Sequence, residues 1–211
     1  MEERVDSGDW LGQAITLDEL GSVYREQGRL SEAEAKHLQS LEIFKLHDLL
    51  DGQAASHHKL GKLYSTRKCW AKAEAAYGES LRLKRAIRDE VGEVITLDNL
   101  AEAYQEQGRI PEAEATCRQS YGIIREGGTA VQLWRTLRRL ALLREKQKDI
   151  PGARALVEEA VVLLGKKNKT KPLAEAEELL ARLGAHVGDR SRRGWWRRVI
   201  SIAFERSRRG S

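Results

Sequence analysis

The sequence of 211 residues is poor in cysteine, proline and phenylalanine, with two, three and two of each. Two cysteines, Cys69 and Cys117, are too few for a disulfide framework, which favours a reducing compartment. No stretch approaches the roughly 18 uncharged apolar residues that a membrane span needs. The acidic start, MEERVDSGD, is unlike a secretory or mitochondrial leader. We therefore expect a soluble, cytoplasmic protein.

The sequence also lacks the motifs that carry catalysis or metal binding. His57 and His58 are adjacent, so on a helix their side chains diverge by about 100° and do not converge on one metal ion. Neither cysteine lies in a CxxC motif, and the sequence has no HExxH motif and no phosphate-binding glycine loop. We expect no enzymatic activity, no metal site and no cofactor.

What the sequence does contain is charge and helix-forming residues. Charged residues make up 33% and hydrophobic residues 41%, a balance typical of helices with charged outer faces. The net charge of +5 is unevenly distributed. Residues 190–211 hold eight arginines and one acid, giving +7, so the preceding 189 residues carry 5 − 7 = −2. The basic tail and the faintly acidic body therefore need separate explanations.

Internal repetition organises the body. YREQGRLSEAEA at 24–35 recurs as YQEQGRIPEAEA at 104–115 with nine of twelve letters unchanged, and YSTRKCWAKAEA at 64–75 is a weaker copy, so the period is forty. Four sets of equivalent positions follow this period: Leu20, Leu60, Leu100 and Leu140; Gly21, Gly61, Ala101 and Ala141; Ala33, Ala73, Ala113 and Ala153; Gly28, Lys68, Gly108 and Lys148.

Each repeat has the pattern of two helices. Leu17, Leu20 and Tyr24 recur at helical spacing, and Gly28 is suited to end the first helix in a positive-φ conformation. The second helix is expected to start near Ser31, which has capping-box spacing to Glu34. Gly52 and Gly92, one period apart, are predicted to mark the joints between repeats.

These features resemble the tetratricopeptide repeat. The resemblance rests on Leu-Gly-x-x-Tyr at 20–24 and 60–64, on the glycines at 28 and 108, and on the alanine set. It implies an all-α fold, a solenoid of helix-turn-helix repeats wound into a right-handed superhelix. The usual unit has about 34 residues, and the longer unit here is similar to those of kinesin light chain and bacterial regulatory repeat proteins. The expected organisation is a lead-in at 1–8, four repeats at 9–165, a capping helix at 172–184 and a basic amphipathic helix at 190–211.

The resemblance further implies that the first helices line a concave groove that binds a protein or peptide. The expected function is therefore a scaffold or regulatory adaptor. Asn99 is the best single candidate, because its amide can pair with a partner's backbone whatever the partner's sequence. The alternative is that these positions carry ordinary surface charges. The groove candidates flank the core stripe, and they are Asp18, Ser22, Arg25, His58, Lys59, Lys62, Asp98, Asn99, Glu102, Gln105, Arg138 and Arg139.

The tail is an amphipathic segment if it is helical. Trp196, Val199, Ile200 and Ala203 then share one face, with Trp195 beside it and Arg197 and Arg198 mostly elsewhere. Three interpretations remain open for this segment: a final helix folded back on the repeats, an anchor on an anionic membrane, or an arm that binds a partner protein or nucleic acid. The alternative function is accordingly an adaptor recruited to a membrane or nucleic acid through Trp195, Trp196, Arg197 and Arg198.

Overall fold

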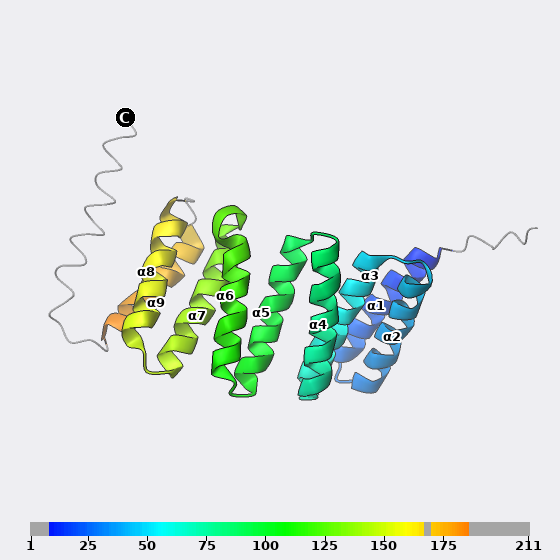
Figure 1. Cartoon of the computed structure of the whole chain (residues 1–211). Helices are drawn as coiled ribbons and strands as arrows, with labels where there is room; N and C mark the ends of the chain where they lie inside the picture. The colour runs from blue at the N-terminus through cyan, green and yellow to red at the C-terminus, as the bar shows by residue number, and fades with distance from the viewer. Residues whose placement is uncertain (1–8, 167–169, 186–211) are drawn as a thin grey trace, which may run out of the picture. The chain divides into compact units, whose positions relative to one another are not determined.

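The computed structural model describes residues 9–166 and 170–185, and within them the chain is all α-helix (Figure 1). Helices begin at residues 10, 30, 50, 70, 90, 110, 130, 150 and 170, so a pair of helices recurs every forty residues. The helices are α1 (Trp10–Glu26), α2 (Leu30–Leu46), α3 (Leu50–Thr66), α4 (Trp70–Ala86), α5 (Glu90–Glu106), α6 (Ile110–Gly127), α7 (Ala130–Lys146), α8 (Ile150–Lys166) and α9 (Thr170–Ala185). The all-α class and the helical repeats are confirmed.

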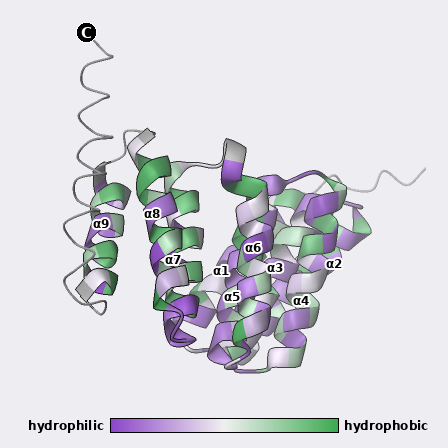
Figure 2. Ribbon diagram, turned by 60° about the vertical axis from the view of Figure 1, so that its left-hand side comes forward, coloured by the Kyte–Doolittle hydropathy of each residue, from purple (hydrophilic) through white to green (hydrophobic). Residues whose placement is uncertain are grey.

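The helices belong to two compact units. Unit 1, residues 1–126, contains α1–α6, and unit 2, residues 127–211, contains α7–α9. Within unit 1, α1 packs on α2, α2 on α3, α3 on α4 and α4 on α5, and within unit 2, α7 packs on α8 and α8 on α9. Most helices show hydrophilic and hydrophobic bands along their length, as amphipathic helices do (Figure 2). Helix α9 (Thr170–Ala185) includes residues 172–184, where the repeat frame predicts a helix.

The turns within repeats lie at the predicted positions. Gly28 and Gly108 have φ of 77° and 76°, and the equivalent Lys68 and Lys148 take the same left-handed conformation with φ of 56° and 63°. The prediction of a positive-φ residue at the end of the first helix is therefore confirmed, even where the residue is lysine.

Two finer predictions about helix ends are wrong. Gly52 and Gly92 lie inside the first turns of α3 and α5, and the joints between repeats are instead the left-handed Asp48 and Arg88. A Cβ on Gly52 would come within 2.3 Å of the Phe44 ring, so this glycine serves close helix packing. Helix α2 begins at Leu30, near Ser31 as predicted, but the predicted capping box is absent, because Arg29 is the cap residue and makes no side-chain capping bond.

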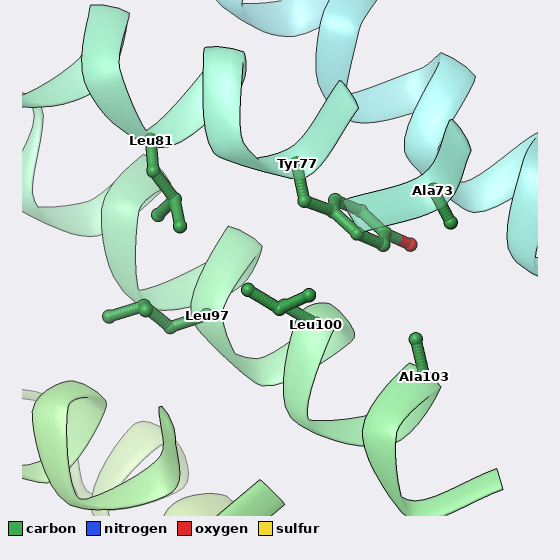
Figure 3. Close-up of a cluster of buried hydrophobic side chains, with 6 residues drawn as sticks. All are labelled: Ala73, Tyr77, Leu81, Leu97, Leu100 and Ala103. Carbon is green, nitrogen blue, oxygen red and sulfur yellow. The ribbon is translucent and has the colours of Figure 1, made fainter. Parts of the chain in front are cut away.

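The core of unit 1 lies between successive helices. One cluster joins Ala73, Tyr77 and Leu81 of α4 to Leu97, Leu100 and Ala103 of α5, and Figure 3 shows these side chains extending into the space between the two helices. A second cluster joins α2, α3 and α4 through Ala33, Leu41, Leu60, Leu63 and Ala76. Helices α3 and α4 therefore bury side chains against both neighbours, which is how a solenoid builds a continuous core from units that could not fold alone.

The small residue in each first helix matches the size of its partner in the second helix. A Cβ on Gly21 would meet the His37 ring at 2.8 Å, and one on Gly61 would meet the Tyr77 ring at 2.5 Å. In the next two repeats the first-helix position holds alanine, and the positions equivalent to the rings hold the smaller Cys117 and Val157. Ring size explains why two repeats need glycine at this position and two accept alanine.

Buried hydroxyl groups also recur with the repeat. Ser40 Oγ donates to the carbonyl of Ala14 at 2.7 Å, and Ser80 Oγ donates to the carbonyl of Ala54 at 2.9 Å. Both serines are fully buried. Each one ties the second helix of a repeat to the backbone of its first helix, so the pairing is polar as well as apolar.

Candidate partner-binding faces

One face of each first helix of unit 1, α1, α3 and α5, is left open to solvent. At about 100° per residue, positions 11, 15, 19, 22 and 26 of α1 fall within an arc of about 80°. None of these residues is buried in α1, and the same holds for the equivalent residues of α3 and α5. We call this surface of unit 1 the first-helix face. Its residues are Leu11, Ile15, Glu19, Ser22 and Glu26 on α1; Asp51, Ala55, Lys59, Lys62 and Thr66 on α3; and Val91, Ile95, Asn99, Glu102 and Glu106 on α5.

Part of the predicted groove set lies on this face. Lys59, Lys62 and Asn99 are half-buried and Glu102 is exposed, each at a position of the face. Ser22 is half-buried and donates its hydroxyl to the carbonyl of Asp18 at 3.0 Å. Gln105 is also half-buried, at a position nearer the core.

The predicted groove set is wrong for Asp18 and Asp98, because both side chains are buried. They are 2% and 3% exposed, so no partner can contact them on this surface. Position 18 lies about 20° outside the open arc, on the side that packs against the second helix of the repeat. Ser120 of α6 donates to Asp98 Oδ1 at 3.1 Å. The predicted stripe was therefore rotated by roughly 50° toward the core.

Asp18 is the centre of a buried polar network. Its Oδ1 lies 2.9 Å from His37 Nδ1, and its Oδ2 accepts a hydrogen bond from Ser56 Oγ at 3.0 Å. Lys59 Nζ lies 3.3 Å from the same Oδ2. Serine, histidine and aspartate are the residue types of a hydrolase triad, but Ser56 bonds to Asp18 rather than to His37. All three are buried, so no substrate could reach the hydroxyl, and the network stabilises the packing of α1, α2 and α3.

The first-helix face contains a pocket of about 340 Å³. Residues of α1, α3 and α5 line it, together with Lys68 from the turn after α3 and Tyr77 from α4. The pocket lining carries charges of both signs. The basic side chains come from α1, α3 and the turn after α3, and the acidic side chains are glutamates of α5. The lining residues are Arg25, Lys62, Ser65, Thr66, Lys68, Tyr77, Asn99, Glu102, Ala103 and Glu106.

A hydrogen-bonded chain orients Asn99 at this pocket. Thr96 Oγ1 donates to the carbonyl of Gly92, so it accepts from His58 Nδ1 at 3.0 Å. His58 Nε2 then accepts from the Asn99 amide at 3.1 Å. Burial lowers the pKa of His58 to about 4, and Lys62, Lys84 and Lys59 add to this effect. His58 is therefore neutral near pH 7, as its role as an acceptor from Asn99 requires. His58 was predicted to contact a partner, whereas in the structure it holds the Asn99 side chain in position.

The face also carries exposed aliphatic residues on α1 and α5 that the prediction missed, whereas α3 between them has Asp51 and Ala55 at the equivalent positions. Leu11, Ile15, Val91 and Ile95 are each at least 40% exposed, and all lie in the first half of α1 or α5. The charged pocket lies toward the second half of the same helices. The exposure of these residues could have been predicted from the sequence, because positions 11 and 15 share an arc with positions 19 and 22.

Unit 2 has its own pocket, of about 710 Å³, between α7 and α9. Arg138 lines it, whereas Arg139, also predicted, is half-buried on the same helix. Trp134 Nε1 donates to Glu175 Oε2 at 2.7 Å, and Arg182 pairs with Glu145 at 2.7 Å. The lining residues are Trp134, Arg138, Leu142, Glu175, Glu178, Leu179 and Arg182.

The predictions for the lead-in at 1–8 and the tail at 190–211, with Trp195, Trp196, Arg197 and Arg198, lie outside the described residues. Across residues 9–166 and 170–185, no helix combines the length and the hydropathy that a membrane span requires. In the same residues, no three His, Cys, Asp or Glu side chains are grouped as metal ligands would be.

Successive packed helix pairs with one open face define an α-solenoid of helical repeats. The model of the tetratricopeptide repeat matches three overlapping stretches of the chain, residues 12–86, 52–126 and 93–164. Because these stretches together span most of the sequence, the chain belongs to the tetratricopeptide repeat family. A comparison with curated protein sequences finds no match.

Solved structures show the same fold. The chain is similar to BtubC (BKLC) from P. vanneervenii, with 20% identity, a TM-score of 0.68, and coverage of 80% of this chain and 70% of that one. It is also similar to the nearly identical TPR-like repeats of a putative kinesin light chain from Podosopora anserina, with 21% identity, a TM-score of 0.67, and coverage of 92% of this chain and 96% of that one. Aspartyl phosphate phosphatase F from Bacillus subtilis shares 15% identity with a TM-score of 0.72, and the match covers 80% of this chain and 44% of that one. At these identities the likeness concerns the fold alone.

Proposed function

We propose that the protein is a non-catalytic scaffold or adaptor that holds a segment of a partner protein on the first-helix face of unit 1. Folds of this family generally bind protein or peptide partners. The observation that supports this site is the pocket of about 340 Å³, whose lining includes Arg25, Lys62, Asn99 and Glu102.

The chemistry of the face indicates what kind of segment fits. Leu11 and Ile15 on α1 and Val91 and Ile95 on α5 offer two aliphatic patches, separated by Asp51 and Ala55 of α3, on which apolar side chains of a partner lose water on binding. Lys62 and Glu102 offer charges of both signs at the other end of the helices, where they select orientation more than they add affinity. The best-fitting partner is therefore an amphipathic segment that is apolar at one end and carries both an acidic and a basic side chain at the other.

Asn99 supplies a contact that does not depend on the partner's side chains. Its amide nitrogen donates to His58, which holds the side chain in place at the pocket. An amide has a second N–H and an oxygen acceptor, and both match the groups of a peptide backbone. Ordering before binding reduces the entropy that the complex must lose.

Affinity purification with three forms of the full chain tests the proposal. The first is the wild type, the second carries Lys62→Glu with Ile95→Asp on the face, and the third carries Glu42→Lys with Ala75→Asp. Glu42 and Ala75 are exposed on the second helices α2 and α4, so the third form matches the number and type of changes. A partner retained by the wild type and the third form, but lost from the second at unchanged helicity, supports the site.

Equal recovery of every partner by the first two forms would place binding elsewhere on the chain. Titration calorimetry of the recovered partner with each form then measures the loss directly, and a ten- to hundredfold weaker affinity, about 1.4–3 kcal/mol, is expected for the face variant.

A further inference from the structure

Helix α9 leaves open a surface that is covered in every other first helix. Positions 14 and 21 of α1 face the second helix of their repeat, and Gly21 lies directly against His37. The equivalent residues of α3, α5 and α7 are all buried: Ala54, Gly61, Val94, Ala101, Trp134 and Ala141. In α9 the equivalent residues are Ala174 and Ala181, and both are exposed.

The opposite side of α9 is fully packed. Ala176, Leu180 and Leu183 are 0%, 2% and 1% exposed, and α9 packs on α8. These residues are equivalent to Ser56, Leu60 and Leu63 of α3, which stack that repeat on the one before it. Helix α9 is therefore stacked as the first helix of a fifth repeat, with the side for its second helix left free among the described residues.

The repeat frame identifies what should cover that side. In the four complete repeats the second helix begins twenty residues after the first, at 30, 70, 110 and 150. Helix α9 begins at residue 170, so the next start falls at 190. The basic segment 190–211 begins there, and its apolar Trp196, Val199, Ile200 and Ala203 have the spacing of one helical face. This face is offset from the buried positions of α2, because the residues equivalent to the buried Ala33 and His37 are Arg193 and Arg197.

Charge favours the same occupant. Between Ala174 and Ala181, the open side of α9 carries Glu177 and Glu178, both exposed. Segment 190–211 carries eight arginines and one acid. Connections of three residues join the two helices of earlier repeats, such as 27–29 and 67–69, so residues 186–189 are long enough to reverse the chain in the same way.

We propose that segment 190–211 docks on the open side of α9 in the same chain, in the place of the second helix of a fifth repeat but turned so that its apolar face, rather than Arg193 and Arg197, meets α9. This face covers Ala174 and Ala181, and the arginines lie close to Glu177 and Glu178. Alanine at position 181 suits this docking, because a large side chain there would keep a helix off this surface. The docked segment hides its tryptophans, so it cannot simultaneously insert them into a membrane. This inference does not depend on the partner bound by unit 1.

Hydrogen exchange measured by mass spectrometry on the full chain tests the proposal. Docking should slow exchange in peptides from 190–206 at least about tenfold relative to an unstructured peptide, because their amides then exchange only through local opening. Ala181→Arg should abolish that protection by blocking the surface and repelling the arginines, while peptides from α8 keep theirs. Ala155→Arg places the same side chain at an exposed alanine of α8 and should change nothing in 190–206.

Four results would overturn the proposal. One is exchange of 190–206 at the unstructured rate in the wild type. A second is protection that survives Ala181→Arg, which means docking elsewhere. A third is protection that falls on dilution, which assigns the surface to the segment of a second copy. The last is protection that appears only with anionic vesicles or an oligonucleotide, which makes the segment a recruitment arm. Protection that is independent of concentration and is lost only in Ala181→Arg supports it.

Discussion

Exchanging Gly61 and Tyr77 for the residues of the next repeat tests the size matching between paired helices. In Gly61→Ala, the new Cβ would lie 2.5 Å from Tyr77 Cδ1, far inside the optimal contact distance of about 3.5–4.0 Å. Overpacking of this kind costs about 1–3 kcal/mol, and the better helix propensity of alanine returns at most about 1 kcal/mol. We expect Gly61→Ala to lower the free energy of unfolding by about 1–2 kcal/mol.

Replacing Tyr77 by cysteine should reverse the sign of the effect of Gly61→Ala on the free energy of unfolding. Tyr77→Cys alone should cost about 3–5 kcal/mol, since it removes a ring from a fully buried site. Adding Gly61→Ala to Tyr77→Cys recreates the pair Ala101 and Cys117. The methyl group then enters vacated space, and the double variant should be more stable than Tyr77→Cys by up to about 1 kcal/mol.

Urea unfolding followed by circular dichroism gives each free energy and so the coupling between the two sites. Gly78→Ala in α4 is the matched control, because its new Cβ would have no neighbour within 4 Å. It should stabilise the protein by up to about 1 kcal/mol. If Gly61→Ala had the same cost with tyrosine and with cysteine at position 77, ring size would not explain the glycine, and the size-matching argument would be refuted.

Three further predictions concern stability. Ala113 is fully buried, so Ala113→Leu should lower the free energy of unfolding by about 1–3 kcal/mol, measured by urea titration. Ser80→Ala should cost on the order of 1 kcal/mol in the same assay, because it removes the hydrogen bond that the Ser80 hydroxyl donates to the Ala54 carbonyl. The pKa of His58 is depressed in the fold to about 4, so the unfolded chain binds the extra proton first. Stability should therefore fall as pH drops from about 6.5 to about 4, by an amount on the order of 3 kcal/mol that His58→Gln removes.

The repeat frame made most of the fold predictable. Equivalent leucines and alanines recur every forty residues, and α1–α8 begin at the spacing that this period requires. Helix ends were less predictable, because a positive φ at the joints falls on Asp48 and Arg88, residues that carry no glycine signal. Gly52 looked like a joint but is small because Phe44 packs against it.

The open face of the first helices was predictable only in part. Position 22 of the repeat was placed correctly, with Lys62 and Glu102 at the pocket, whereas position 18 was not. A charged residue beside the core stripe usually faces water, but Asp18 is buried because His37, Ser56 and Lys59 satisfy it. These three residues belong to α2 and α3, so the sequence of α1 alone could not predict that Asp18 is buried. The aliphatic residues at positions 11 and 15 would have been found by counting the open arc outward from position 22.

Site-specific photo-crosslinking tests the central claim, that a partner segment lies on the first-helix face of unit 1, most directly. A benzophenone amino acid is placed at Ile95 on the face or at Ala75 on the second helix α4, both of which are exposed. The partner recovered by the wild type should crosslink at Ile95 and not at Ala75, with the attached peptide containing apolar residues. Crosslinking at Ala75 without crosslinking at Ile95 would contradict the account and assign binding to the opposite surface of the repeats.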